Sequence, residues 1–477
     1  LDSNELSEDY KISKIYLGLN LDDYKKKFEI IKNHILRGEI YQLNFSFPIH
    51  FHFRGNPMSL YLELKKTQKT SYSSIYKNGD YYILSLSPES FFKIENGIIQ
   101  SRPMKGTGNE NPIEITEKLK AENFMILDLL RNDFGKICKF GSVNVKDLLR
   151  EENYGTLRQL TSGVVGELKN NSIKDIILSL FPSGSITGAP KLSAMKYISE
   201  LESENRGIYT GSIGYVSPEG KSVFNILIRT IEINKNSGKI NIGSGIVWDS
   251  KATEEYDECL LKSKFFFKNS KIDLLETILY KRNSFYYLTD HIIRLKNASN
   301  FFGYNIDFEN IKIKISKNLP DNNFNYKIRL TCNSDKFNLE YFPLEKKIKY
   351  GKVQLSKVNT NSKNILLTYK NTNREIYNSE FQKAIEKGLT DFIFLNEKKE
   401  ITEGSISNIF VLIGNIYYTP PVECGLLPGI FRNKLLKKFP KYFKIGIIRE
   451  EDLKETNSIF ICNSIRGIIR VNYEKTN

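Results

Sequence analysis

Apolar residues recur along this chain at two spacings, three to four residues in some stretches and two in others. The longer spacing runs through residues 21–35 and stops at Gly38, which predicts an amphipathic helix with the apolar face Leu21, Tyr24, Phe28, Ile31 and Ile35. A long strand is expected over residues 40–53 and a helix over residues 113–134. In that helix Glu122 falls near the apolar stripe, so its carboxylate should face inward.

The two-residue spacing is clearest in residues 224–229. It predicts a strand on which Arg229 points to the opposite face from Ile226 and Ile228. The expected neighbour of this strand is a second one over residues 239–247.

Near residues 265–272 the pattern of strands and helices restarts. A chain of 477 residues with 40% hydrophobic composition is long enough for two or three domains. We therefore expect two domains of mixed helix and sheet, α/β or α+β, over residues 1–267 and 268–477.

Charge and cysteine usage exclude some classes of protein. The formal net charge is +15, but the lysines are spread over the whole chain and interleaved with apolar residues, which favours solvated helix faces over a nucleic-acid groove. No stretch approaches the roughly 20 apolar residues that cross a bilayer, and the first residues are acidic without an apolar signal region. The five cysteines show no paired spacing, so we expect reduced thiols and a cytoplasmic protein without nucleic acid or membrane as partner.

Several separated blocks stand out in the first region: Ser87-Pro88-Glu89, residues 122–133 and residues 181–191. By these blocks and their order, the stretch from residue 38 to 265 resembles the chorismate-using enzymes. Residues 101–107 add Lys105, which resembles the nucleophile of the aminodeoxychorismate synthases. The resemblance implies the large sheets and flanking helices of the chorismate-utilising fold.

Displacing a hydroxyl from a cyclohexadiene needs an activated nucleophile, an acid for the leaving group and a cation that holds the substrate carboxylates. The resemblance implies Lys105 as the nucleophile, its pKa lowered by burial and nearby cations, and Glu89 as the general acid. It also implies Mg²⁺ held by Glu122, Glu255 and Glu258, the last two about one turn apart on a predicted helix over residues 253–264.

By the same resemblance, small residues, a tyrosine and an arginine surround chorismate. Small residues at a helix start suit an anionic ligand, and an arginine on a strand face suits a carboxylate clamp. The expected set is Ser185, Thr187, Gly188, Tyr209, Arg229, Gly243 and Gly245. Without the resemblance, Lys105 reads as a surface lysine, the glutamate pair as a solvated helix face and Arg229 as a structural ion pair.

Two departures from the family pattern bear on the reaction. Met104 stands where isoleucine is usual, and Gln159 stands where many relatives have histidine. A neutral amide cannot donate a proton as imidazolium can, which weakly disfavours pyruvate elimination in this domain. Relatives also carry a longer region before Gly38, and the sequence leaves open whether this chain is naturally short or a fragment.

The second region contains three blocks, residues 291–295, 367–374 and 402–410. By their order and spacing, residues 273–470 resemble the fold-type IV pyridoxal-phosphate enzymes, which include aminotransferases and aminodeoxychorismate lyase. The resemblance implies that Lys370 carries the cofactor and shuttles protons, and that Glu403 pairs with the pyridine nitrogen. It implies a phosphate site formed by Arg294, with Ile430 and Ser464 supplying donors. We read His291 as a structural histidine. Taken singly, each of these residues reads as an ordinary surface or hairpin residue.

Fold-type IV alone leaves aminotransferase and lyase open, and the fusion favours the lyase. We therefore expect chorismate and ammonia to become aminodeoxychorismate and then 4-aminobenzoate for folate synthesis. No cysteine sits in the glycine-flanked elbow that a glutaminase nucleophile needs, which implies a separate glutamine amidotransferase as ammonia source. A homodimer through the second domain stays open. The alternatives are an anthranilate synthase-like first domain, an amino-acid aminotransferase second domain, and a non-catalytic sensor of chorismate or pyridoxal phosphate.

Overall fold

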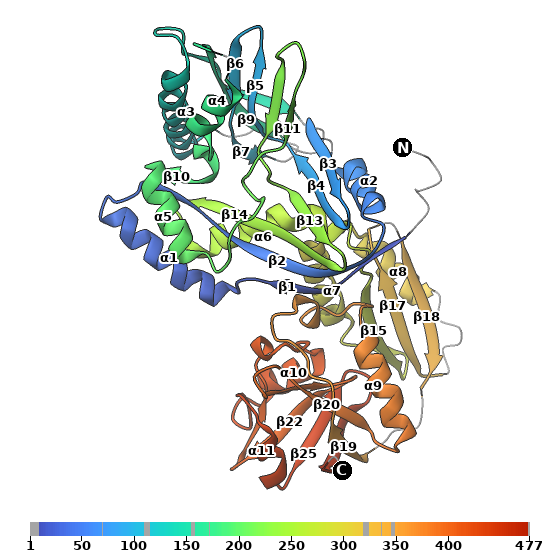
Figure 1. Cartoon of the computed structure of the whole chain (residues 1–477). Coiled ribbons are helices and arrows are strands. Elements are labelled where there is room, and N and C mark those ends of the chain that lie inside the picture. The colour runs from blue at the N-terminus through green and yellow to red at the C-terminus, as the bar shows by residue number, and fades with distance from the viewer. Residues whose placement is uncertain are drawn as a thin grey trace. The chain divides into compact units, whose positions relative to one another are not determined.

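The computed structural model describes most of the chain and divides it into two compact units (Figure 1). The described residues are 9–68, 70–108, 115–153, 158–170, 172–317, 324–334, 336–344 and 349–475, without the side chains of 105–108, 118, 152, 153, 158 and 159. The first unit contains Leu17–Asn269 and the residues before Ile12, and the second contains Ser270–Asn477 together with Ile12–Tyr16. Strand β1 (Tyr10–Leu17) is therefore divided between the units.

One antiparallel sheet of the first unit has the strand order β2-β14-β13-β4-β3, with β10 also paired to β2. Its strands are β2 (Gln42–Gly55), β3 (Tyr72–Asn78), β4 (Tyr81–Ser87), β10 (Gly188–Ala189), β13 (Thr230–Asn234) and β14 (Ser237–Ile246). The expected strand over residues 40–53 is confirmed as β2, with its start two residues later than predicted.

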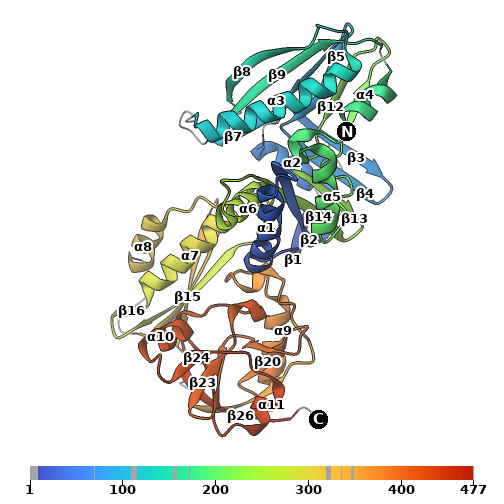
Figure 2. The same cartoon turned by 90° about the vertical axis from the view of Figure 1, so that its left-hand side faces the viewer.

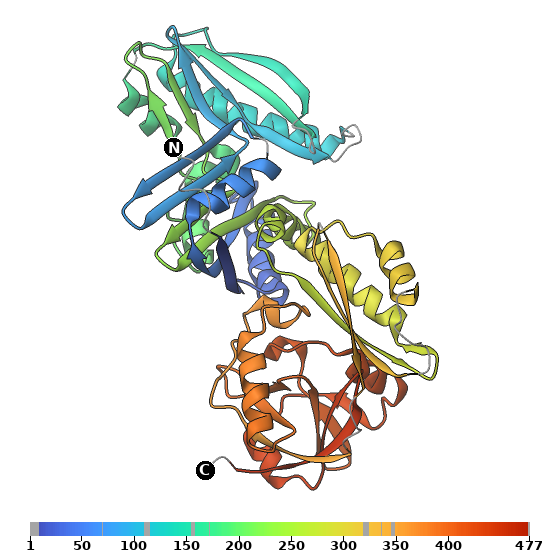
Figure 3. The ribbon, with the colours of Figure 1, turned by 90° about the vertical axis from the view of Figure 1, so that its right-hand side faces the viewer.

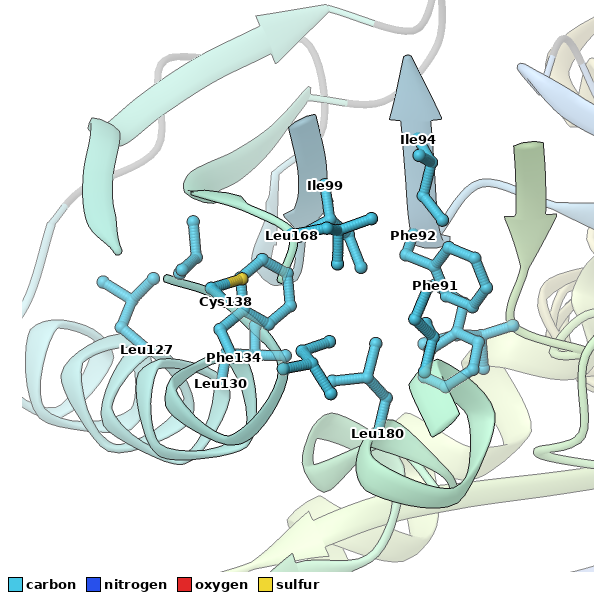
Figure 4. Packing of buried hydrophobic residues seen from close by; sticks show 14 of the residues in the cluster. Phe91, Phe92, Ile94, Ile99, Leu127, Leu130, Phe134, Cys138, Leu168 and Leu180 are labelled. Carbon is cyan, nitrogen blue, oxygen red and sulfur yellow. The ribbon is translucent and has the colours of Figure 1, made fainter. Parts of the chain in front are cut away.

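The second sheet of this unit has the order β11-β12-β5-β6-β9-β7, with β8 also paired to β9. Its strands are β5 (Ser90–Glu95), β6 (Ile98–Arg102), β7 (Met104–Gly108), β8 (Asn144–Asn153), β9 (Arg158–Glu167), β11 (Gly214–Val216) and β12 (Ser222–Asn225). Helices α3 (Glu117–Ile137) and α4 (Ile173–Leu180) pack beside this sheet (Figure 2). Figure 4 shows Leu130 and Phe134 of α3 in one cluster with Phe92 of β5 and Ile99 of β6. Burying each such side chain contributes about 1.5–3 kcal/mol.

The remaining helices of the first unit are α1 (Leu21–Leu36), α2 (Pro57–Thr67), α5 (Lys191–Leu201) and α6 (Ala252–Lys268), with a 3₁₀ turn at Gly184–Ile186. Helix α1 is confirmed: four of its five predicted apolar positions are buried, and Gly38 follows with a φ of 71° that favours glycine. Helix α6 includes the predicted helix over residues 253–264.

The predicted strand over residues 224–229 is wrong beyond Asn225. Strand β12 ends there with a register shift against β5, and the chain continues irregularly to Arg229, whose φ of 47° is left-handed. Strand β13 then begins in the other sheet and pairs with β4 and β14. The predicted neighbour, observed as β14, thus pairs with β13 and β2 and not with β12. The bulge and the left-handed residue allow the chain to pass from one sheet to the other. Apolar and polar residues continue to alternate in the sequence across this passage, so the alternation does not reveal it.

The second unit has a small antiparallel sheet and a larger mixed one. The small sheet has the order β16-β15-β17-β18, from β15 (Leu274–Lys281), β16 (Ser284–Tyr286), β17 (Tyr326–Cys332) and β18 (Phe337–Pro343). Helix α7 (Leu288–Phe302) packs on β15, with α8 (Phe308–Lys317) following it (Figure 3).

The larger sheet has the order β21-β20-β19-β26-β25-β22-β23-β24. Its strands are β19 (Tyr350–Leu355), β20 (Asp391–Leu395), β21 (Ile401–Gly404), β22 (Asn408–Ile413), β23 (Ile416–Thr419), β24 (Phe443–Ile445), β25 (Ile459–Asn463) and β26 (Gly467–Tyr473). Helices α9 (Glu375–Glu386), α10 (Ile430–Lys438) and α11 (Glu450–Glu455) complete the unit, with 3₁₀ turns at Ile365–Leu367 and Val422–Cys424. The core of this sheet is aliphatic, with residues such as Val353, Ile393 and Ile461 buried. Both units confirm the expected mixture of helix and sheet.

All five cysteines lie among the described residues, where they are buried and form no disulfide, as their spacing predicts. Within the described residues, no helix has the length and apolar character needed to span a membrane.

Candidate active sites

The predicted acid Glu89 is buried beside the loop that precedes α5. The side chain of Glu89 is held by Ser185, whose Oγ donates to Glu89 Oε1 at 2.9 Å. The Ser183 and Ser185 hydroxyls lie 3.0 Å apart. The backbone of Glu89 is also held in place, because its N–H donates to Ser87 Oγ. The structure thus brings two predicted site residues, Glu89 and Ser185, into direct contact.

Three of the predicted glycines lie side by side across β2. Gly188 pairs with Leu43 on one edge of β2, while Gly245 and Gly243 pair with Asn44 and Ser46 on the other. Gly188 has a φ of 145°, and a Cβ there would lie 2.2 Å from the carbonyl oxygen of Gln42. A Cβ at Gly243 would lie 2.7 Å from the carbonyl oxygen of Phe45. Glycine is therefore required at both positions for the backbones to approach this closely.

A buried ion pair between Glu202 and Arg206 connects β2 to the loop that precedes α5. The sequence analysis did not predict this pair. Glu202 and Arg206 form a salt bridge of 2.7 Å, with side chains 5% and 13% exposed. Arg206 also donates to the carbonyl oxygens of Ile186 and Asn44, and Glu202 accepts from the backbone N–H of Ser46. The spacing of four residues was a signal, but helix pairs of this kind usually lie on the surface.

Tyr209 and Arg229 are predicted to bind the carboxylates of the substrate. Tyr209 is buried and Arg229 is partly buried. Burial raises the pKa of Tyr209, over whose ring the guanidinium of Arg206 lies at 5.8 Å. Burial lowers the pKa of Arg229, which makes one long hydrogen bond of 3.5 Å to Gln68 Oε1. No carboxylate of the described residues forms an ion pair with Arg229. The structural ion pair weighed from the sequence is therefore absent from the described part of the chain, and the guanidinium can accept an anionic ligand.

The three predicted magnesium ligands are not gathered into one cluster. Glu255 is buried and accepts from Ser250 Oγ at 2.7 Å, whereas Glu258 is exposed and pairs with Lys262 Nζ at 2.8 Å. Glu122 is partly buried on α3. Across the described ranges, no group of three or more His, Cys, Asp or Glu side chains could hold a metal ion. The magnesium assignment stays a prediction, one that two of these carboxylates with waters and a substrate carboxylate would satisfy.

The predicted nucleophile Lys105 lies on β7, opposite Leu160 of β9. Gln159, the departure noted in the sequence, lies opposite Thr107 in the same ladder. The side chains of both residues fall outside the described part of the structure, so their roles stay predictions.

In the second unit, Lys370 lies in the segment before α9 and is held by its neighbours. Its carbonyl oxygen accepts from the backbone N–H of Leu275 at 3.0 Å, and Tyr369 stacks on Phe301 with ring centroids 4.5 Å apart. Burial of the ammonium group, aided by the charges of Arg294 and Arg374, lowers the pKa of Lys370 to about 7. An amine with this pKa is largely neutral at mildly basic pH and is able to act as a nucleophile or base.

Glu403 on β21 is buried, and burial raises its pKa to about 7. Its Oε2 accepts from Asn408 Nδ2 at 3.3 Å, while its Oε1 has no hydrogen-bond partner in the described structure. The turn after Glu403 is fixed by Asp391, which accepts from the backbone N–H of Ser405 at 2.8 Å. A buried carboxylate with one unused oxygen fits the protonated pyridine nitrogen of pyridoxal phosphate.

Arg294 on α7 is bound by a carboxylate that the sequence analysis did not single out. Its Nε donates to Glu276 Oε1 at 2.8 Å and its Nη2 to Glu276 Oε2 at 2.7 Å, and His291 Nδ1 lies 2.6 Å from the same Oε2. His291 is fully buried, which agrees with the structural role expected for it. A glutamate inside the apolar stretch of residues 274–278 was the available signal for Glu276.

The two remaining predicted cofactor residues lie at backbone positions suited to donors. Ile430 is the first residue of α10 and follows the N-cap residue Gly429. A Cβ at Gly429 would lie 1.9 Å from Asn408 Oδ1. Ser464 follows β25, and its Oγ donates to the carbonyl oxygen of Thr277 at 3.4 Å. An unpaired helix N-terminus and an arginine together fit a phosphate group.

Comparison with known families identifies the class of protein. Residues 2–268 match the chorismate binding enzyme family, over more than half of the chain, so the chain belongs to that family. Residues 273–473 match amino-transferase class IV. The protein thus joins a chorismate-utilising enzyme domain to a fold-type IV domain, as the sequence motifs predict.

The curated relatives include two activities at equal identity. Anthranilate synthase component 1 of Saccharolobus solfataricus is 34% identical over 268 residues, covering 54% of this chain and 64% of that protein. Aminodeoxychorismate synthase component 1 of Escherichia coli is 34% identical over 273 residues, covering 54% of this chain and 60% of that protein. The chain therefore spans about 60% of the length of these relatives.

Solved structures resemble each half. Anthranilate synthase component I from Streptococcus pneumoniae is 33% identical with a TM-score of 0.48, covering 54% of this chain and 59% of that one. A putative 4-amino-4-deoxychorismate lyase from Legionella pneumophila is 23% identical with a TM-score of 0.38, covering 43% of this chain and 83% of that one.

Proposed function

We propose that this chain makes 4-aminobenzoate from chorismate in two steps, one in each domain, with the domains divided near residues 267 and 268. The first domain replaces the chorismate hydroxyl by an amine, and the second removes pyruvate from the product. The observation that carries the proposal is the presence of both enzyme families in one chain, since the amine made by the first is a substrate for the chemistry of the second. The reaction supplies folate synthesis in the cytoplasm.

In the first step, Lys105 attacks the substrate ring as the hydroxyl leaves, and ammonia then replaces the lysine. Glu89, oriented by Ser185, protonates the departing hydroxyl, which leaves as water. Arg229 and the backbone around Gly188 and Gly243 hold the carboxylates of chorismate. Two of the carboxylates Glu122, Glu255 and Glu258, together with waters and a substrate carboxylate, would hold Mg²⁺, which would neutralise that substrate carboxylate.

In the second step, the residues of the chain bind and orient pyridoxal phosphate and move a proton. The cofactor, when bound, supplies the electron sink for breaking the bond to pyruvate. Lys370 would hold the cofactor through its amine and, once the substrate amine has displaced it, would take a proton from the substrate, for which a pKa of about 7 is suited. Glu403 would hold the proton at the pyridine nitrogen, and Arg294, Ile430 and Ser464 would hold the phosphate.

Ammonia comes from a separate glutamine amidotransferase subunit. The naming of the relatives as component 1 supports such a partner. Free ammonium salts should replace the partner in the test tube.

The test is to incubate the chain with chorismate, ammonium, Mg²⁺ and pyridoxal phosphate and to separate the products by chromatography. We expect 4-aminobenzoate and pyruvate in equal amounts. Accumulated anthranilate would contradict the first step, whereas accumulated aminodeoxychorismate would contradict the second.

Two alternatives have specific support. The equal identity to anthranilate synthases favours an anthranilate-forming first domain, which the same chromatogram would reveal. The class IV family also contains aminotransferases, and an amino-acid aminotransferase in the second domain would convert a 2-oxo acid in the presence of glutamate without chorismate.

A further inference from the structure

Three consecutive residues of β15 each contact one of the predicted cofactor residues. The N–H of Leu275 donates to the carbonyl oxygen of Lys370 at 3.0 Å. The carboxylate of Glu276 binds Arg294, and the carbonyl oxygen of Thr277 accepts from Ser464 Oγ at 3.4 Å. Because β15 pairs with β17 through residues Leu274 to Tyr280, this short segment is held firmly in the sheet. It is therefore placed to set the relative positions of the amine and the phosphate-binding groups.

The contact between Glu276 and Arg294 decides which edge of the guanidinium is available. A guanidinium can bind two oxygens along its Nε–Nη2 edge or along its Nη1–Nη2 edge. Glu276 occupies the first edge with both of its oxygens, at 2.8 and 2.7 Å. Nη2 carries a second N–H, which points along the other edge, and Nη1 makes no hydrogen bond to any described residue. That edge remains free for two oxygens of one phosphate.

Glu276 itself is fixed in its charged form and in one orientation. Burial acts to raise its pKa, but the charge of Arg294 and hydrogen bonds from His291 and Arg294 outweigh burial and lower the pKa to about 2. His291 and Arg294 are three residues apart on the face of α7 that packs on β15. The histidine binds Oε2, so the carboxylate cannot turn away from the arginine without losing a second buried contact.

We propose that Glu276 is a positioning residue for the cofactor phosphate: it presents the free Nη1–Nη2 edge of Arg294 to the phosphate, and His291 locks Glu276 in place. The proposal rests on the function proposed above, since it needs a phosphate-bearing cofactor in this site. Its consequence is selective. Loss of Glu276 should weaken the binding of the phosphate group and leave the contacts of Lys370 and Glu403 to the ring unaffected.

The test compares pyridoxal phosphate with pyridoxal, which lacks the phosphate, in the full chain carrying Glu276→Gln. Binding to the cofactor-free protein is followed by the absorbance change of the cofactor. We expect the dissociation constant for pyridoxal phosphate to rise about tenfold or more, the scale seen when an orienting partner is lost. The constant for pyridoxal should change less than about twofold. Inorganic phosphate should compete with pyridoxal phosphate less well in this variant than in the unchanged protein.

The matched control is Glu380→Gln on α9, which removes another buried carboxylate with one lysine and one hydroxyl partner. It should change neither constant. If Glu276→Gln weakened both ligands equally, Glu276 would have a merely structural role and the proposal would be overturned. An unchanged affinity for both would overturn it as well.

Should Glu276→Gln fail to fold, Glu276→Asp gives the same comparison, because the shorter side chain keeps the charge but reaches only part of the edge. It should show the same preferential loss of pyridoxal phosphate, by a smaller factor, and an equal loss of both ligands would again overturn the proposal. Failure of the underlying function is distinguishable, because then the unchanged protein would bind neither ligand.

Discussion

The predicted cofactor site of the second unit differs from the predicted chorismate site of the first in how its charged groups are held. In the second unit, burial shifts the pKa of Lys370 and of Glu403 to about 7, from opposite directions. In the first unit, the buried carboxylates Glu89 and Glu255 accept hydrogen bonds from serine hydroxyls, and Arg229 makes one long hydrogen bond to the amide of Gln68 among the described residues.

This difference follows from what each site is proposed to bind. A resident cofactor can be met by groups whose charges are already adjusted to it, since it stays through every turnover. A substrate that arrives with its own carboxylates and a cation is better met by groups that gain partners on binding. If the two sites work separately, a change in one site should leave the function of the other unaffected.

The largest effect should come from Lys370→Ala. Loss of the amine that attaches the cofactor and moves the proton should lower 4-aminobenzoate formation by about a thousandfold or more. The first site should be untouched, so aminodeoxychorismate should accumulate at the normal rate, as measured by chromatography. A variant that still converted aminodeoxychorismate would show that Lys370 is not the reactive lysine.

The reciprocal change is Lys105→Ala. We expect it to abolish the mass increase that covalent attachment of the substrate gives to the intact protein, and to lower amination by about a hundredfold or more. The absorbance of bound pyridoxal phosphate should be normal. Lys174→Ala, at an exposed lysine of α4, serves as control and should leave both readouts unchanged. Full amination by Lys105→Ala would show that ammonia attacks the ring directly, with only the metal and the acid assisting the step.

Part of the fold could be predicted from the sequence, because the helical spacing of α1 records which face that helix buries. The passage from β12 to β13 could not, since alternation continued through a left-handed residue at which the chain leaves one sheet for the other. Among the site residues, motifs pointed to Glu89 and Ser185, which the structure joins. Glu276 was missed because its partners lie on another element, and the pair of Glu202 and Arg206 was missed because a spacing of four residues usually indicates a pair on the surface.

A moderate effect is expected from Arg229→Lys in the first site. Lysine keeps the charge but loses the paired donors that fit a carboxylate. We expect kcat/KM for chorismate to fall about ten- to a hundredfold, mainly through KM, with unchanged melting temperature and unchanged binding of pyridoxal phosphate. A fall in melting temperature with normal KM would assign Arg229 a structural role.

The smallest effect, and the most direct measure of the difference between the sites, concerns the pH dependence of cofactor attachment. Because burial lowers the pKa of Lys370 to about 7, the neutral amine increases as pH rises through 7 and is nearly complete by pH 8. The rate of absorbance change after mixing the cofactor-free protein with pyridoxal phosphate should rise roughly tenfold between pH 6 and 8 and then level off.

An ordinary lysine amine, tested as a small blocked lysine under the same conditions, should instead keep rising about tenfold per pH unit through this range. Dividing the protein rate by this reference removes the ionisations of the cofactor itself. A protein rate that rose in parallel with the reference beyond pH 8 would show that the pKa of Lys370 is not lowered. In that case Lys370 would not be prepared for the cofactor by a shifted pKa. The contrast between the two units would then rest on the raised pKa of Glu403 alone.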